Sequence, residues 1–203
     1  GLNDVYQHPN LETIAKKMIG TDEIVLVSAA TLYKRPSDTT EWKREGEHVD
    51  VMFSVDELMQ TPRRMLCMMM VFANDLPEGR GNTWVRPRSH MQIAQWLKDN
   101  DQQPIRESPT IFENLPKLDY ADPIPVVAKA GQVLCFSTAL IHCGSTNITD
   151  EPRKLMFSNY CQLGRLKDTT GNYNQREARS KWREGLKAKF RPDRLNLLED
   201  SEG

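Results

Sequence analysis

Residues 130–155 read AGQVLCFSTALIHCGSTNITDEPRKL, and this stretch decides the fold. An apolar run ends at His142, a turn rich in Ser, Thr and Asn follows, and Arg153 opens the next run. Short apolar and β-branched runs bounded by Gly, Asn and Pro are typical of β-strands. The stretch therefore predicts a hairpin that places the strand beginning at Arg153 beside the strand that ends at His142.

The regions on either side of this stretch show the same pattern. Further β-prone runs lie at 23–33, 47–55, 64–75 and 82–89, and the run at 64–75 is apolar enough to be buried on both faces. Helical spacing occurs at 10–19, where Asn10 could cap the start and Gly20 end the helix, and again at 174–190. Many short strands between turns favour a sandwich or barrel. We therefore expect a mainly β (α+β) fold, either a sandwich or a barrel, with flanking helices.

The length and composition favour one domain over residues 1–203, because 203 residues with 38% apolar content can bury a single core. We place the β core at about 20–162. Residues 91–125 form a long excursion that we interpret as a lid or insert. Residues 165–203 form a charged helical extension, either a solvated face or a basic docking surface for an anionic partner.

The sequence also argues against several kinds of partner and location. A net charge of −1 gives no general signal for nucleic acid. There is no apolar run of about 18 residues and no signal-peptide pattern, so we expect no membrane partner. The four cysteines form no C-x-x-C pair, which favours a reduced, cytoplasmic location, although they could also pair as disulfides. Nothing in the sequence indicates the oligomeric state.

A candidate metal site begins with the segment EGEHVDVMF at 45–53. Side chains alternate along a strand, so His48 and Asp50 should project from one face while Val49, Val51 and Phe53 face the other way. His142 supplies a third candidate ligand. Two histidines and one carboxylate with open positions are typical of non-haem Fe(II) oxygenases.

The ordered set of motifs resembles the phytanoyl-CoA dioxygenase family. The motifs are H-x-D at 48–50, PRSH at 87–90 and the stretch at 130–155, and together they cover residues 20–162. Positions that fit the family pattern are Gly131, Phe136, His142, Gly144, Asn147 and Arg153. Two positions depart from it, because Val49 stands where Gln is common and Arg88 stands where Gly is usual. Family members also usually have more N-terminal structure, so we expect that part of the fold to be missing before residue 1.

The resemblance implies a double-stranded β-helix core, which is a jelly-roll of the cupin-like kind, and a specific set of cofactors. Fe(II) would bind His48, Asp50 and His142, and 2-oxoglutarate would chelate the metal while its far carboxylate pairs with Arg153. Ser145 or Thr31 would add a hydroxyl contact to 2-oxoglutarate. With O2, such an enzyme hydroxylates a C–H bond of a small organic substrate and releases succinate and CO2.

The family also indicates the type of oxidation. Related halogenases have a small residue where this chain has Asp50, so Asp50 favours hydroxylation over halogenation. Two other functions stay open: a ligand-binding β-helix domain that has no catalytic activity, and a zinc hydrolase that uses the same triad. Tyr33 and Lys34 either line the pocket mouth or simply end a strand.

Overall fold

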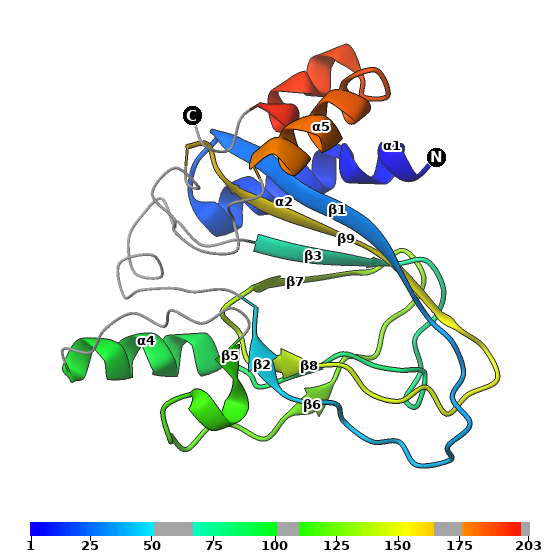
Figure 1. Ribbon diagram of the computed structural model, residues 1–203, viewed down its shortest axis with the longest axis vertical. Helices are drawn as coiled ribbons and strands as arrows, with labels where there is room; N and C mark the ends of the chain where they lie inside the picture. Colours follow the sequence, from blue (N-terminus) through cyan, green and yellow to red (C-terminus); the bar gives the residue numbers. More distant parts are fainter. Residues whose placement is uncertain (51–66, 101–109, 165–175, 200–203) are drawn as a thin grey trace.

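The computed structural model describes residues 1–50, 67–100, 110–164 and 176–199 (Figure 1). Its core is two antiparallel sheets. The major sheet has the order β1-β9-β3-β7 and the minor sheet the order β5-β2-β8-β4-β6. The predicted mainly β fold with a jelly-roll core and flanking helices is confirmed.

The strands of the two sheets differ in length. The major sheet consists of β1 (Ile24–Lys34), β9 (Arg153–Gln162), β3 (Cys67–Phe72) and β7 (Val133–Ser137). The minor sheet consists of two-residue strands: β5 (Thr110–Ile111), β2 (His48–Val49), β8 (His142–Cys143), β4 (Trp84–Val85) and β6 (Ile124–Pro125). The predicted continuation of the His48 strand through Val51 and Phe53 lies outside the described residues.

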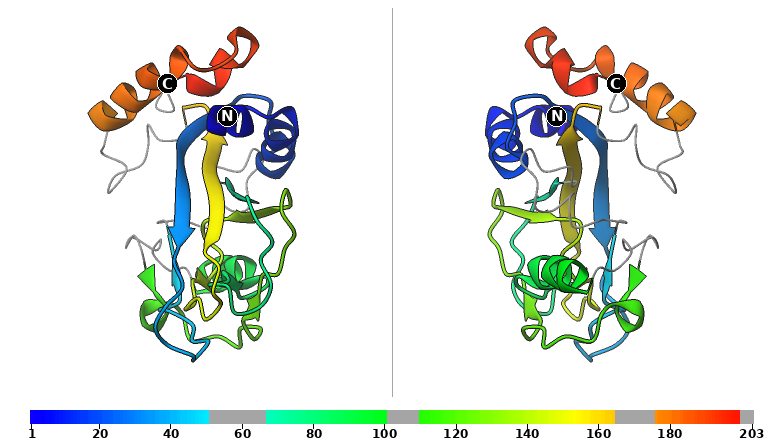
Figure 2. Two further views of the ribbon diagram at one scale, coloured as in Figure 1. Left: turned by 90° about the vertical axis from the view of Figure 1, so that its right-hand side faces the viewer. Right: turned by 90° about the vertical axis from the view of Figure 1, so that its left-hand side faces the viewer.

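The outer face of the major sheet is covered by helices. These are α1 (Leu2–Tyr6), α2 (Pro9–Ile19) and the short helix η3 (Pro192–Leu198), with α5 (Arg176–Lys187) alongside. Figure 2 shows β1 and β9 side by side, with all these helices at the same end of the two strands. Buried Tyr160 anchors them, because its hydroxyl donates to the Tyr6 carbonyl oxygen at 2.7 Å.

Helix α2 begins and ends close to its predicted limits. His8, not Asn10, is the cap: His8 Nδ1 accepts a hydrogen bond from the Asn10 amide, and Pro9 takes the first helical position. Gly20 ends the helix at φ 89°, a left-handed conformation that suits glycine.

The methionine-rich strand β3 is buried on both faces, as its composition predicts. Met69 packs outward under the helices, whereas Met68 and Met70 pack inward with Phe136 and with Val85 of the minor sheet. The inner cluster joins residues from both sheets, so the sheets face one another across it.

The described parts of residues 91–125 contribute to the core. This segment contains most of α4 (Ser89–Asp99), the short helix η1 (Phe112–Asn114) and both edge strands of the minor sheet, β5 and β6. In α4, Ile93 and Leu97 pack with Val49 of β2. The part of the segment at 101–109 lies outside the described residues.

The predicted hairpin between His142 and Arg153 is wrong. Strand β8 pairs with β2 and β4 in the minor sheet, whereas β9 pairs with β1 and β3 in the major sheet. The intervening segment crosses from one sheet to the other (Figure 1). Buried Asn147 supports the crossing by donating to the carbonyl oxygens of Lys34 and Glu151, and these bonds replace the ladder that a hairpin would have had.

Two other predictions concern the whole chain. None of the helices described here is long and apolar enough to span a membrane. All four cysteines lie within the described ranges as free thiols, and Cys67, Cys143 and Cys161 are buried.

Candidate active site

Three side chains meet on the inner face of the minor sheet. His48 and His142 are direct cross-strand partners on β2 and β8, and their ring centroids are 4.7 Å apart. Asp50 lies between them, with Oδ1 3.4 Å from His48 Nε2 and Oδ2 3.3 Å from His142 Nε2. One donor atom from each residue lies within 4.8 Å of the other two, so the three residues could hold one metal ion.

Both imidazole rings are oriented by the backbone. His48 Nδ1 lies 2.9 Å from the Gly46 carbonyl oxygen, and His142 Nδ1 lies 2.9 Å from the Leu140 carbonyl oxygen. A carbonyl oxygen only accepts hydrogen bonds, so each Nδ1 carries the proton. In the neutral ring, Nε2 then presents its lone pair to the triad centre, which is the arrangement that metal-ligating histidines need.

Within the triad, Asp50 and His48 each favour the charged form of the other. Burial of Asp50 disfavours its ionised form, but the interactions of its carboxylate with His142 and His48 outweigh this effect and hold the pKa of Asp50 below its usual range. The hydrogen bond with Asp50 raises the pKa of His48, against the effect of burial. Asp50 is therefore a carboxylate at neutral pH and a suitable anionic ligand for a divalent cation.

Arg153 supplies a buried positive charge between the sheets. It is 8% exposed, and its side chain is on the same face of β9 as Leu155, which belongs to the inner cluster. Nη1 donates to the Gly81 carbonyl oxygen at 2.6 Å and contacts Thr83 Oγ1 at 3.4 Å, while Nε is buried without a partner. Burial lowers the pKa of the guanidinium.

This guanidinium has no directly bonded carboxylate within the described ranges, although the charge of Glu45 acts on it from a distance. In the part of the chain that the structure describes, no carboxylate forms a salt bridge with Arg153. A buried cation without a counter-charge is unfavourable, so the site is suited to an anionic group from a ligand.

Two polar residues beside Arg153 extend the candidate anion site. Lys34 pairs directly with Arg153 across β1 and β9, so both point to the same face of the major sheet. The Thr83 hydroxyl is buried next to the guanidinium. Lys34, at the end of the first β-prone run, is one of the two residues predicted for the pocket mouth. No sequence motif marks Thr83. Tyr33, the alternative at the pocket mouth, is 59% exposed on the other face.

Ser145 and Thr31, the two residues expected to add a hydroxyl contact, do not reach this site. The Ser145 hydroxyl is fully buried, accepts from Trp42 Nε1 at 3.1 Å and donates to the Asn82 carbonyl oxygen at 2.9 Å. Thr31 is exposed and pairs with Met156, a residue of the outer cluster, so it faces away from the triad. We include neither residue in the proposed site.

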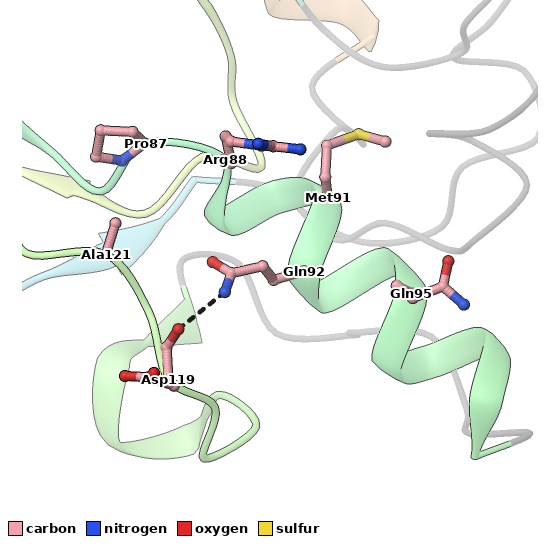
Figure 3. Close-up of a pocket in the computed structure, with 7 residues that line it drawn as sticks. All are labelled: Pro87, Arg88, Met91, Gln92, Gln95, Asp119 and Ala121. Carbon is pink, nitrogen blue, oxygen red and sulfur yellow. Dashed lines mark hydrogen bonds between the residues drawn. The ribbon is translucent and has the colours of Figure 1, made fainter.

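An open groove runs along α4. It has a volume of about 540 Å³ and lies between α4 and the segment around Asp119 and Ala121 (Figure 3). Gln92 spans it by donating to the Asp119 carbonyl oxygen at 2.9 Å. The groove starts at Pro87, two residues after Val85, the cross-strand partner of His142.

Arg88 forms the start of this groove with an unusual backbone. Its φ of 65° is the one positive value at a non-glycine position in the described ranges. The glycine that the resembled family pattern has at this position would suit this backbone, because a Cβ makes the left-handed region unfavourable.

The donor set suits more than one metal. Two imidazole nitrogens and a carboxylate with open positions are typical of Fe(II) oxygenases, and nitrogen and oxygen ligands also suit zinc. The buried Arg153 separates the two interpretations. Zinc-dependent hydrolysis has no need of a guanidinium that binds a second carboxylate, whereas a chelating dicarboxylic co-substrate does.

Comparisons with known proteins give the same fold. The solved structure of the epimerase SnoN, in complex with Fe3+, alpha-ketoglutarate and nogalamycin RO, has a TM-score of 0.53 at 18% identity, over 83% of this chain and 65% of that one. HygX from Streptomyces hygroscopicus, with nickel and 2-oxoglutarate bound, has a TM-score of 0.53 at 13% identity, over 78% and 65%. The non-haem monooxygenase ThoJ has a TM-score of 0.55 at 14% identity, over 78% and 54%.

The sequence comparisons show the family. This chain spans between about one third and two thirds of the length of the solved structures that it matches first. No curated protein sequence matches it significantly. The profile of the phytanoyl-CoA dioxygenase family matches residues 2–155, which is most of the chain. The chain therefore belongs to the phytanoyl-CoA dioxygenase family.

Proposed function

We propose that this chain is an Fe(II)- and 2-oxoglutarate-dependent oxygenase that hydroxylates a C–H bond of a small organic substrate. The observation that carries this proposal is the pairing of the triad with Arg153, a buried guanidinium that has no carboxylate partner among the described residues. A zinc hydrolase or a simple binding domain would not need both. The structures of SnoN and HygX contain alpha-ketoglutarate or 2-oxoglutarate, which supports the choice of co-substrate.

In this proposal, the residues of the metal end hold and orient the ion. His48, Asp50 and His142 bind Fe(II) through Nε2, a carboxylate oxygen and Nε2, respectively. The backbone carbonyl oxygens of Gly46 and Leu140 keep the two rings in the metal-binding tautomer. Bound Fe(II) would supply the activation of O2, coupled to oxidative decarboxylation of 2-oxoglutarate to succinate and CO2.

The residues of the other end bind the co-substrate. Arg153 pairs with the far carboxylate, Thr83 donates its hydroxyl to the same group, and Lys34 adds a second positive charge. Phe136 packs edge-on against the His142 ring, with centroids 5.2 Å apart, and keeps this side of the ligand apolar. The substrate binds in the groove along α4 and meets the metal from that side.

We further propose that residues 1–203 act as one domain and that Asp50 favours hydroxylation over halogenation. The four free thiols support a reducing location such as the cytoplasm.

A direct test uses the metal-to-ligand charge-transfer band. Fe(II) and 2-oxoglutarate are added to the protein without oxygen, and the visible spectrum is recorded. The proposed function predicts a band that requires both additions and is lost in the Arg153→Ala variant at low co-substrate concentration. A preparation that binds Fe(II) but shows no band at any 2-oxoglutarate concentration would contradict the proposal. Succinate release under oxygen then distinguishes an enzyme from a binding domain.

A further inference from the structure

Gly144 follows His142 by two residues and lies against the carboxylate of Glu45. A Cβ at position 144 would meet Glu45 Oε2 and lie 3.9 Å from Lys34 Nζ, so the end of the Glu45 side chain lies directly against Gly144. The Glu45 amide also donates to the Gly144 carbonyl oxygen at 2.9 Å, which fixes the start of the Glu45 side chain. The Glu45 carboxylate therefore lies at the edge of the proposed co-substrate pocket.

Glu45 is the counter-charge of this pocket. Its carboxylate forms an ion pair with Lys34, whose ammonium is 28% exposed while the carboxylate is 50% exposed. Lys34 is the cross-strand partner of Arg153, and the negative charge of Glu45 also acts on the buried guanidinium. Two cations and one anion leave a net charge of +1, which matches one carboxylate of a ligand.

We propose that Glu45 acts as a built-in competitor of the co-substrate. While the pocket is empty, Glu45 neutralises Lys34; the far carboxylate of an entering 2-oxo dicarboxylic acid displaces Glu45 from Lys34. This inference rests on the proposed function, because the displacing group is the far carboxylate of 2-oxoglutarate. Its consequence is that Glu45 weakens co-substrate binding, and that its removal should affect dicarboxylic acids only.

The experiment compares two ligands with one variant. Glu45→Gln keeps the size of the side chain and removes its charge. Binding to the Ni(II)-loaded protein is measured by titration calorimetry, and binding to the Fe(II) protein by the charge-transfer band without oxygen. The ligands are 2-oxoglutarate and 2-oxobutanoate, which has the same chelating group and no far carboxylate. We expect Glu45→Gln to tighten 2-oxoglutarate binding by about threefold to fivefold, the range of a partly exposed ion pair, and to leave 2-oxobutanoate binding unchanged.

Three further variants make the test specific. Glu45→Ala should act in the same direction, because the effect comes from the charge. In a Lys34→Gln background, the gain from Glu45→Gln should largely disappear. The matched control is Glu184→Gln, which removes a carboxylate paired with Lys187 on α5, at the opposite end of the molecule (Figure 1). It should leave the affinity for both ligands unchanged.

Each other outcome overturns the inference. Weaker 2-oxoglutarate binding in Glu45→Gln would show that Glu45 holds Lys34 in place for the ligand. Unchanged binding would show that Glu45 does not compete. An equal gain in affinity for both ligands would show that Glu45 acts on the chelating end of the ligand, near the metal, and not on the far carboxylate. A wild-type protein that binds metal but neither ligand would instead contradict the proposed function, and the inference with it.

Discussion

Glu47 and Arg86 form a two-pronged ion pair, with Arg86 Nε and Nη2 each 2.9 Å from a carboxylate oxygen of Glu47. Arg86 also donates to the Ala121 carbonyl oxygen at 3.0 Å and lies over the Phe112 ring at 4.8 Å. Glu47 precedes the proposed metal ligand His48 on β2, and Arg86 follows Val85 of β4, the cross-strand partner of His142. The pair therefore links the ends of β2 and β4, the two strands that flank β8, which carries His142.

Removing this pair should destabilise the minor sheet. We expect Arg86→Gln to lower the free energy of unfolding by about 2 kcal/mol, because it leaves a largely buried carboxylate with fewer partners. A double-mutant cycle with Glu47→Gln should show coupling above about 0.5 kcal/mol. Urea unfolding of the metal-free protein measures both quantities. The exposed pair Lys129–Asp75 is the control, and similar coupling there would contradict a special role for Glu47 and Arg86.

Loss of one ligand should abolish tight metal binding. We expect His142→Ala to weaken binding of Ni(II) or Fe(II) by about 100-fold or more, since even indirect partners of metal ligands contribute 10- to 100-fold. Titration calorimetry with Ni(II) gives the affinity directly. His8→Asn is the matched control, because it removes an exposed histidine from α2 and keeps a side chain that can cap the helix. Equal affinity in both variants would show that the metal binds elsewhere.

Arg153 should act on the co-substrate alone. We expect Arg153→Gln to leave metal affinity within about twofold and to raise the 2-oxoglutarate concentration needed for half-saturation by about tenfold or more. The reason is the loss of a charge-assisted hydrogen bond to a carboxylate, which contributes about 1.5–3 kcal/mol. The charge-transfer band measures saturation. Binding of 2-oxobutanoate should not change, and a parallel loss for this ligand would contradict the assigned role.

The left-handed backbone at Arg88 should make glycine favourable there. We expect Arg88→Gly to raise the free energy of unfolding by about 1 kcal/mol, because removing Cβ relieves the strain of φ 65°. Thermal and urea unfolding test this prediction. Arg88→Ala keeps Cβ and should give no such gain, so an equal gain in both variants would attribute the effect to the charge or length of arginine.

The sequence predicted the parts of the site that depend on strand alternation and motif order. His48 and Asp50 face the same side because they are two apart in extended chain, and the burial of Met68 to Met70 follows from an apolar run. These features are local, so residue spacing is enough to predict them. The assembly of His142 with the pair is not local, and its prediction depends on the two-histidine, one-carboxylate ligand set of non-haem Fe(II) sites and on the order of the motifs.

The features that the sequence did not predict depend on tertiary contacts. Nothing in residues 143–152 shows that this segment crosses between sheets, because a turn in a hairpin has the same Ser, Thr and Asn residues. Thr83 precedes β4 of the minor sheet and Arg153 begins β9 of the major sheet, so they approach one another only through the packing of the two sheets. The hydroxyl of Ser145 is already used by Trp42 and Asn82, and sequence alone does not show such a partner.

The crossing segment between β8 and β9 has a consequence for the size of the ligand. His142 and Arg153 are eleven residues apart, yet they belong to opposite layers, so the two ends of the proposed co-substrate are held by different sheets. The distance between the two sheets then sets the length of the 2-oxo dicarboxylic acid that can reach both residues. An oxo acid one methylene shorter than 2-oxoglutarate would lose one of its two anchors, and a longer one would have to bend. In this view the β-sandwich selects its co-substrate by length as well as by charge.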